Sequence, residues 1–511
     1  MNGRRWLAAG ILVLWFVVLG AHVKREYFHA EGERIALGAR TLAPGTYFYV
    51  VRMNGTAVGT ATMRLRDTTG GFVFDDNLLM DVPALDTLHR AAAMTRILLD
   101  STLQLTSFAY RIDAKNGAYA IQGERAADST LNILVEAGGQ PQRSSIANAG
   151  DLLLDAAVPM RMAAAGRLVV GSEHSARIFD PSSMSVRSIT VRVTATDTMI
   201  VADSARMGED GRWITQVYDT VPVWKLEQEF SGISMVTWVD DDGLIVRAES
   251  PMGLALQRTT YEDARQDWAA AQNDPSLAAG YGALIESTAI ASSADLRGIE
   301  TTNEFRVRLA GVDLEGFDLS GGRQTLQGDT LTIRRESDSE LQSAGYTLPW
   351  TDGGEPASEL GPAVLVQSDD PAIRAKAIEV TGGAKDPAEA ARALERWIFR
   401  NVKKEIVPGV PSALQTLEAL RGDCNEHTVL YVAMARSIGL PARIAAGVVH
   451  VRGRFYYHAW PEVWLNGAWI AADPTLGQYP ADASHIRFVI GGLAQQAALI
   501  RLIGSLRLEA L

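Results

Sequence analysis

The chain has 511 residues, 47% of them hydrophobic, so it is long enough to bury more than one core. Its 60 acidic residues against 48 basic ones give a net charge of −12, the wrong sign for a phosphate-binding surface, so nucleic acid is excluded as an expected partner. The single cysteine, Cys424, excludes an intrachain disulfide and is either a small buried apolar side chain or a reactive thiol.

The chain begins with a candidate membrane anchor. Residues 6–23 are apolar apart from His22, and basic pairs flank them at 4–5 and 24–25. That length just spans a hydrocarbon core, and small residues are not in place for signal cleavage. We therefore predict a cytoplasmic stub and an uncleaved transmembrane helix over 1–25. The bulk of the chain is then expected to be extracytoplasmic, either periplasmic or at the cell surface.

Residues 45–262 are predicted to form a β-rich domain. Short alternating segments such as SITVRVTAT and GLIVRAESP are typical of strands, and Asn54-Gly55 and Asp242-Gly243 are typical hairpin turns. These features favour a sandwich or an open barrel. No group of residues in this domain indicates a chemistry.

Three further segments complete the expected multidomain α+β architecture. Residues 263–295 are rich in Ala, Ser, Asp and Gln and are predicted to be a connector. Residues 296–368 carry RVRLAGVDL and DTLTIRRE, which indicate a small β module or a lead-in to the next domain. Residues 369–511 combine helical and strand patterns and are predicted to form an α+β domain.

Helix signals open this last domain. Asp386 can cap a helix that Pro387 begins, and Ser412 can cap a second, short one. Apolar residues then recur at helical spacing over 424–438, and Gly439 ends the run. We predict that Cys424 stands at the start of this third helix. Backbone N–H groups and the positive end of the helix dipole would there lower the pKa of its thiol and could hold an oxyanion.

Three strands are predicted next, over 442–451, 454–465 and 468–474, with Asn466-Gly467 as a tight turn between the last two. This turn places Trp460 opposite Asp473 and makes His458 the diagonal neighbour of that aspartate, about 7 to 8 Å away at the backbone. An imidazole and a carboxylate can meet at that separation. The carboxylate would fix the ring tautomer and leave the other nitrogen for a thiol.

The stretches GDCNEHTVLYVAMARSIGLPARIAAGVV and FYYHAWPEVWLNGAWIAADPT resemble the transglutaminase-like superfamily. The resemblance implies a papain-like fold in which a helix presents the thiol against an antiparallel sheet. It also implies Cys424 as nucleophile, His458 as general base and Asp473 as the residue that orients the base. No calcium loop stands beside these motifs, so we expect neither a metal nor another cofactor. A Cys424–His427 metal pair was considered and set aside, because two further ligands at a recognisable spacing are missing.

Two functions follow from these expectations. The first is a membrane-anchored thiol enzyme that acts on amide bonds of proteins or peptides through an acyl-enzyme, by transamidation, deamidation or proteolysis. The alternative is a non-catalytic transglutaminase-like scaffold or envelope protein-binding module. The sequence indicates neither the substrate nor the oligomeric state.

Overall fold

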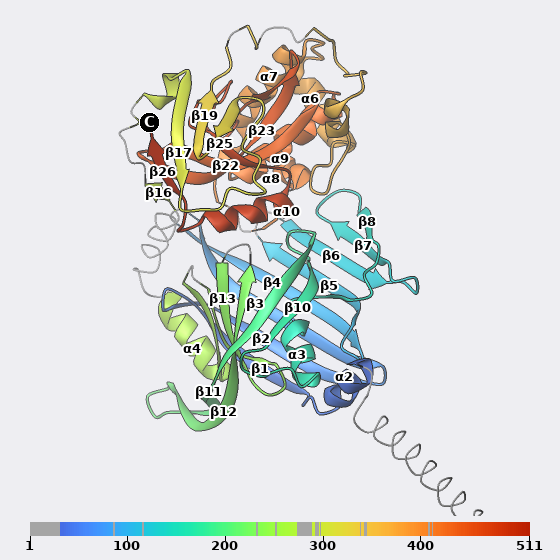
Figure 1. Ribbon diagram of the computed structural model, residues 1–511, viewed down its shortest axis with the longest axis vertical. Coiled ribbons are helices and arrows are strands. Elements are labelled where there is room, and N and C mark those ends of the chain that lie inside the picture. Colours follow the sequence, from blue (N-terminus) through green and yellow to red (C-terminus); the bar gives the residue numbers. More distant parts are fainter. Residues whose placement is uncertain are drawn as a thin grey trace, which may run out of the picture.

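The computed structural model describes residues 31–511 apart from short gaps at 85–86, 115–116, 231–232, 251–252, 273–288, 292–295, 297, 338, 342–344, 407–408 and 411. Two parts lie one above the other in Figure 1. The lower part is a large sheet within residues 45–259, and the upper part combines helices with smaller sheets within residues 290–510.

The lower sheet has 15 strands in the order β8-β7-β6-β5-β4-β3-β2-β1-β15-β14-β13-β12-β11-β10-β9. Its neighbouring strands are antiparallel, except that β9 and β10 are parallel. The strands are β1 Gly45–Met53, β2 Thr56–Thr68, β3 Gly71–Ala84, β4 Thr87–Asp100, β5 Leu105–Ala114, β6 Gly117–Arg125, β7 Leu131–Glu136, β8 Gln142–Ile146, β9 Leu152–Leu153, β10 Glu173–Asp180, β11 Ser185–Met207, β12 Trp213–Phe230, β13 Ile233–Val239, β14 Ile245–Glu249 and β15 Leu254–Thr259.

The predicted hairpin turn at the first strand pair is confirmed. Met53 of β1 pairs with Thr56 of β2, and the two residues between them, Asn54 and Gly55, have φ values of 49° and 86°. Positive φ at both positions is what a tight hairpin turn requires, and Asn and Gly tolerate it best.

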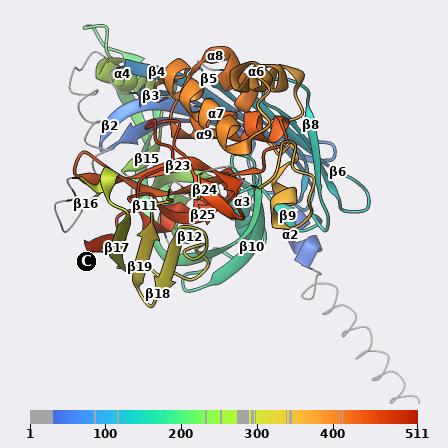
Figure 2. The ribbon, with the colours of Figure 1, turned by 90° about the horizontal axis from the view of Figure 1, so that it is seen from above.

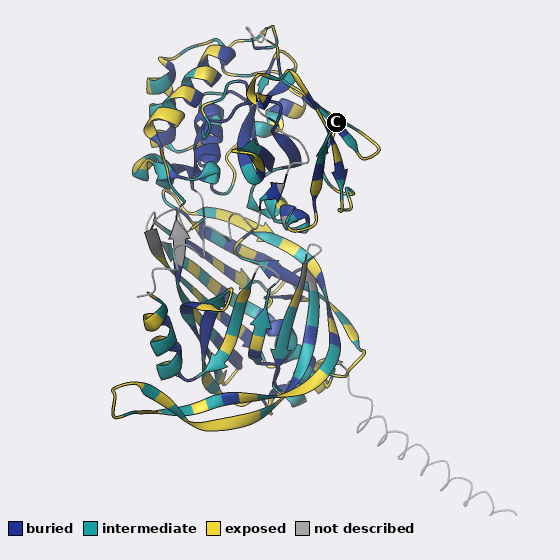
Figure 3. Cartoon of the chain, turned by 90° about the vertical axis from the view of Figure 1, so that its left-hand side faces the viewer, coloured by how far each residue is buried: buried dark blue, intermediate teal, exposed yellow. Residues whose placement is uncertain are grey.

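Helices cover both faces of the sheet near β1. Alternate side chains of a strand point to opposite faces. Tyr49 accordingly packs in the main core with Ile35 of α2 (Glu31–Ala39) and with α3 (Ala157–Ala164), whereas Val50 packs with Ala264 of α4 (Tyr261–Gln272). The dark blue bands in Figure 3 show where this burial lies along the strands.

The β-rich domain predicted as a sandwich or an open barrel is a single sheet that curves round a shared core, so that the rings of Phe108 in β5 and Phe179 in β10 lie 5.4 Å apart. The strands of the lower part form one continuous sheet, because successive hairpins keep each strand beside the next and β1 pairs with β15. Among the described residues, 46% lie in strands and 21% in helices.

The predicted membrane architecture also requires correction. In the described part of the chain, no helix combines the length and apolar character needed to cross a membrane. This finding contradicts the prediction of a single-pass membrane protein with an extracytoplasmic bulk, and we carry neither the anchor nor the location further. Residues 6–23, on which that prediction rested, lie outside the described residues.

The upper part has a five-stranded sheet in the order β16-β23-β22-β25, with β24 beside β23, and a four-stranded sheet in the order β18-β19-β17-β26. A short parallel pair, β20 and β21, completes its strands. The strands are β16 Ile290–Ala291, β17 Glu304–Ala310, β18 Gln324–Gln327, β19 Thr330–Arg334, β20 Lys403–Lys404, β21 Arg421–Gly422, β22 Ala442–Val451, β23 Arg454–Leu465, β24 Ala468–Ala471, β25 Ile486–Ile490 and β26 Arg507–Ala510.

The helices of the upper part, apart from the short last one, lie on one side of the five-stranded sheet, and the four-stranded sheet lies on the other, as the view from above shows (Figure 2). They are α6 Pro371–Thr381, α7 Pro387–Asn401, α8 Ala413–Ala419, α9 Cys424–Ser437 and α10 Leu493–Gln496, with 3₁₀ turns at Ile299–Thr301, Glu355–Glu359 and Ala497–Leu502. Helix α9 is the central one, and its segment 429–435 is buried.

The helix starts follow the predicted signals only in part. Asp386 caps α7 by accepting hydrogen bonds from the backbone N–H groups of Ala388 and Glu389 at 2.8 and 3.0 Å. Ser412 precedes α8 but does not cap it. Its hydroxyl instead donates to the carbonyl of Ala137 in the lower part. Ser412, which the sequence indicates as a helix cap, therefore links two segments that are far apart in the sequence.

Candidate active site

Local structure places the only cysteine at the first position of α9. Asp423 is the N-cap, and its side chain accepts a hydrogen bond from the N–H of Asn425 at 2.8 Å. Glu426 accepts in return from the N–H of Asp423 at 2.9 Å, which completes a capping box. A side chain at Gly422 would meet Glu426 at 2.2 Å, so only glycine allows this close approach. The thiol of Cys424 is partly buried.

The hairpin of β23 and β24 brings the histidine to the aspartate. Glu462 pairs with Ala471, and the strand pairing then stops at the end of β24. The expected pairing of Trp460 with Asp473 does not form, because the backbone of Asp473 turns away and its N–H donates to the carbonyl of Gln478 at 2.8 Å. The side-chain contact forms nevertheless.

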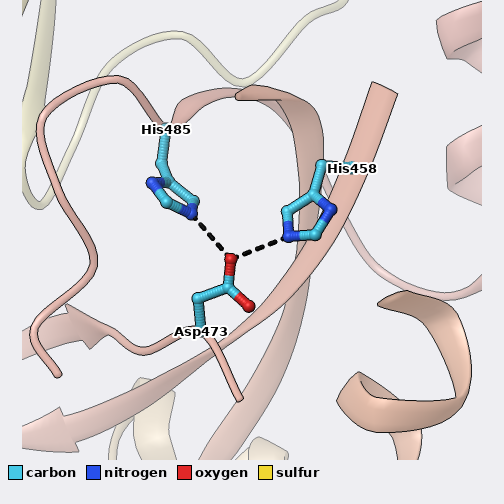
Figure 4. A group of neighbouring side chains, drawn as sticks. All are labelled: His458, Asp473 and His485. Atoms are coloured by element: carbon cyan, nitrogen blue, oxygen red, sulfur yellow. Dashed lines mark hydrogen bonds and ion pairs between the residues drawn. The ribbon is translucent and has the colours of Figure 1, made fainter. Parts of the chain in front are cut away.

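Nε2 of His458 lies 2.8 Å from Oδ2 of Asp473 (Figure 4). The second ring nitrogen, Nδ1, is thereby left for the thiol. His458 lies close enough to Cys424 for each group to influence the pKa of the other by charge and hydrogen bonding, and the backbone of Ala459 acts on the pKa of the thiol as well. The structure thus brings all three predicted residues together. Their assignment as catalytic stays a prediction.

The electrostatics of the histidine and the aspartate are complementary. Burial alone would lower the pKa of His458, but the charge of Asp473 and the contact with Cys424 raise it to about 10. Burial alone would raise the pKa of Asp473, but the charge and hydrogen bond of His458 hold it far below the usual carboxyl range. At neutral pH the pair is an imidazolium and a carboxylate.

The pKa of the Cys424 thiol is shifted in the direction opposite to the predicted one. Burial, and next the charge of Asp423, raise the pKa of Cys424, whereas His458 and the hydrogen bond from Ala459 lower it. The net direction is upward. The helix start that was expected to lower this pKa also supplies a capping carboxylate and a dry environment, and these two effects outweigh the favourable ones.

A second histidine, which the sequence reasoning did not place in the site, completes the group. Nε2 of His485 lies 3.0 Å from Oδ2 of Asp473, and its Nδ1 lies 3.1 Å from Oδ1 of Asp482 (Figure 4). Both nitrogens face carboxylates, which suits a charged ring. Burial opposes that charge, but the hydrogen bonds to the two aspartates raise the pKa of His485 overall.

The signal for His485 was local and weak. It stands three residues after Asp482 in the stretch DASHI, and the N–H and hydroxyl of Ser484 also donate to that aspartate, at 2.9 and 2.6 Å. Such a turn can be recognised from the sequence. Its placement against Asp473 depends on the path of the loop between them, which no short motif specifies.

Three of these residues could hold a metal ion. His458, Asp473 and His485 each offer a ligand atom, and these atoms lie within 4.8 Å of one another. Both histidine nitrogens already hydrogen bond with one carboxylate oxygen, so a cation would have to replace those bonds. The Cys424–His427 pair considered from the sequence is not part of this group. Nδ1 of His427 instead lies 2.7 Å from the carbonyl of Asp423.

Residues 374–474 match the family described as the transglutaminase-like superfamily. The match contains Cys424, His458 and Asp473. An uncharacterized protein of Mycobacterium leprae is 33% identical over 104 residues, which is 18% of this chain and 36% of that protein. The chain therefore aligns with about a third of the length of this curated relative.

Solved structures with some likeness were also found. A candidate cysteine protease from Cytophaga hutchinsonii is 16% identical with a TM-score of 0.28, over 40% of this chain and 83% of that one. A candidate protease from Parabacteroides distasonis is 10% identical with a TM-score of 0.20, over 76% of this chain and 67% of that one. We draw nothing from similarities at this level.

Proposed function

We propose, from the transglutaminase-like domain that residues 374–474 form, that this chain is a thiol enzyme acting on amide bonds of proteins or peptides. The observation that carries the proposal is the chain of contacts from the thiol of Cys424 through the ring of His458 to the carboxylate of Asp473. A nucleophile, a base and a group that orients the base are the parts that acyl transfer needs.

The reaction follows from the positions of these groups. Cys424 reacts as the thiolate, its proton having gone to solvent, beside the imidazolium of His458, and the sulfur forms a bond to the carbonyl carbon of the amide. The carbon–nitrogen bond breaks, and the proton on His458 goes to the leaving amine or ammonia. Water or a second amine then attacks the thioester, gives up a proton to His458, and releases the acyl group with the thiolate restored.

A non-catalytic scaffold is the second candidate. It is favoured by the raised pKa of Cys424, since a buried thiol with little thiolate at neutral pH is a weak nucleophile. The extensive hydrogen bonding around Asp473 argues for the enzyme, because a scaffold gains nothing from a buried aspartate shared by two histidines.

The experiment is the direct detection of the acyl-enzyme. The full chain is mixed with benzyloxycarbonyl-glutaminyl-glycine, quenched in acid and examined by intact-mass spectrometry. The proposal expects a mass increase equal to the peptide less ammonia, absent from Cys424→Ala and strongly reduced in His458→Ala. An equal adduct on Cys424→Ala would place the chemistry elsewhere.

A second arm separates the enzyme from the scaffold when this peptide is a poor substrate. Iodoacetamide alkylation of Cys424 needs no substrate recognition. A rate that falls when His458 is replaced by alanine supports the acyl-transfer proposal. A rate that is indifferent to His458 supports the scaffold.

A further inference from the structure

A pocket of about 500 Å³ lies in the upper part, next to the loop that follows the candidate aspartate. Four arginines line it: Arg335, and Arg392, Arg396 and Arg400 of α7. The last three are spaced four residues apart and therefore share one face of the helix. Like charges at that spacing repel one another, so a bound anion would relieve the repulsion on this face.

The charge of the arginines is only partly compensated: Arg335 donates a hydrogen bond to the carbonyl of Glu300 at 3.3 Å, and the charges of Arg396 and Arg400 act on Glu395. Among the described residues, none of the four forms an ion pair. Arg392 stacks over the ring of Tyr479 at 5.4 Å, and Nε of Arg335 is buried without a hydrogen-bond partner. Glu395 is the acidic residue lining the pocket. Burial, and next the charge of Asp473, raise its pKa to about 7, so it is only partly ionised at neutral pH.

The pocket borders the loop that follows the candidate aspartate. Gly477 lines it, and the N–H of Gly477 donates to the carbonyl of Asp473 at 2.9 Å. A side chain at Gly477 would come within 2.7 Å of the ring of Phe399, which also lines the pocket. The loop that carries Asp473 is therefore packed directly against the arginine-bearing helix.

A basic residue continues from the pocket toward the thiol. The ammonium of Lys404 lies 4.0 Å from the centre of the Phe399 ring. Lys404 pairs with Gly422 in the β20–β21 ladder, and Gly422 is two residues before Cys424. Lys404 therefore adds a positive charge on the segment that lies between Phe399 of the pocket and the strand that leads into Cys424.

We propose that this arginine pocket receives a carboxylate-rich segment of the peptide substrate while Cys424 attacks an amide near it. The inference rests on the proposed function and names its substrate class. Guanidinium groups bind carboxylates through paired hydrogen bonds. Arg392 and Arg400 are eight residues apart, or about 12 Å along a helix, which is too far for one phosphate but matches roughly four residues of an extended peptide.

The test measures binding without turnover. Fluorescein-labelled hexaglutamate is titrated with the full chain carrying Cys424→Ser, and fluorescence anisotropy gives the dissociation constant. Replacing Arg392 and Arg396 by Gln is expected to weaken binding by roughly tenfold or more, because two charge-assisted contacts are lost. Added salt should weaken it too, and labelled hexaglutamine should not bind.

A matched control removes the same charge elsewhere. Arg64 of β2 and Arg212 of the turn before β12 are exposed arginines of the lower part, and the double change to Gln should leave hexaglutamate binding unaltered. Equal binding by the Arg392/Arg396 variant would overturn the proposal, as would inorganic phosphate that competes as strongly as the peptide does. Arg400→Gln alone repeats the test if the double variant does not fold.

The two proposals can fail separately. Hexaglutamate that binds to a chain whose wild type forms no acyl-enzyme would refute the enzyme and leave an acidic-peptide site. An acyl-enzyme on Cys424 without arginine-dependent hexaglutamate binding would leave the enzyme and refute this substrate class.

Discussion

The thiol of Cys424 is subject to opposing influences that separate substitutions can test. Burial and the charge of Asp423 raise its pKa, and His458 lowers it. Glu426 in the same capping box has its pKa raised well above the ordinary value by burial and by Asp423, so removing Asp423 alone would favour ionisation of Glu426. Both must be neutralised to relieve the thiol.

We therefore predict that replacing Asp423 by Asn together with Glu426 by Gln moves the alkylation profile of Cys424 to lower pH. Asn and Gln keep the capping hydrogen bonds, so the helix start is preserved while its negative charge is lost. The measurement is the rate of iodoacetamide alkylation from pH 6 to 10, followed by mass spectrometry on the full chain.

His458→Ala is the opposing control. It removes an interaction that lowers the pKa of Cys424, so its profile should move to higher pH than that of the wild type. A capping-box variant whose profile also moves upward, or does not move, would contradict the assigned role of Asp423.

At the scale of elements, the loop between β24 and β25 determines how Asp473 is held. One end of the loop turns through hydrogen bonds from the N–H groups of Thr475 and Leu476 to Oδ1 of Asp473, at 2.7 and 2.9 Å. The other end brings His485 to Oδ2 of the same residue at 3.0 Å. The carboxylate is therefore fixed on both oxygens before it meets His458.

We predict that His485→Gln slows alkylation of Cys424 at pH 7 by roughly tenfold, since a hydrogen bond to a charged group contributes about 1.5 kcal/mol. The amide can bond to only one of the two aspartates that His485 bridges, so Asp473 is held less firmly. His485 acts here as a positioning residue through Asp473 and His458.

The distinguishing readout is the pH profile. A positioning role changes the pH dependence of alkylation with little change in melting temperature, whereas a merely structural role lowers the melting temperature and leaves the profile of the folded fraction unchanged. His174→Gln in the lower sheet is the control, because its ring contacts Ser172 and lies outside this loop.

The sequence predicts the parts of the candidate site that depend on residues close together in the chain, and it does not predict contacts that depend on the path of a loop. The Asn466-Gly467 turn and the α9 start are local, and both are confirmed: Leu465 pairs with Ala468, and α9 begins at Cys424. Two-residue turns and capping residues carry their own geometry. His485 was missed because its contact with Asp473 depends on a loop path that no periodicity records.

The order of the strands in the lower sheet could not be predicted from the sequence for the same reason. Alternation indicates strands, and it does not indicate which strands are neighbours. Pairing of β1 with β15 joins segments about two hundred residues apart, with Phe48 opposite Thr259. A sandwich and an open barrel have the same local patterns, so the sequence leaves both alternatives open.

At the scale of the whole molecule, polar and apolar contacts join the two parts. Gln142 of β8 donates to the carbonyl of Ala363 at 3.1 Å, and Gln415 of α8 donates to the carbonyl of Ala118 at 2.8 Å. Leu365 belongs to the segment leading into α6 and yet is buried in the core of the lower part. The helix-bearing part is thus anchored on the β6–β8 edge of the sheet.

We predict that Leu365→Ala lowers the free energy of unfolding by about 3 kcal/mol and separates the unfolding of the two parts. Truncating a buried leucine leaves a cavity and loses the transfer free energy of its side chain. Because Leu365 connects the parts, its loss also reduces their coupling. Urea denaturation of the full chain, followed by tryptophan fluorescence and circular dichroism together, measures both effects.

Leu394→Ala provides the comparison, since Leu394 is fully buried within the core of the upper part alone. Leu394→Ala should lower the free energy of unfolding of the upper part by a similar amount. It should leave the coupling between the unfolding of the two parts as it is in the wild type. Coincident transitions by both probes in Leu365→Ala, with the midpoint merely lowered, would show that the remaining hydrogen bonds at the β6–β8 edge couple the parts without this side chain. Two resolved transitions would instead identify apolar packing at Leu365 as the main connection between the sheet and the candidate active site.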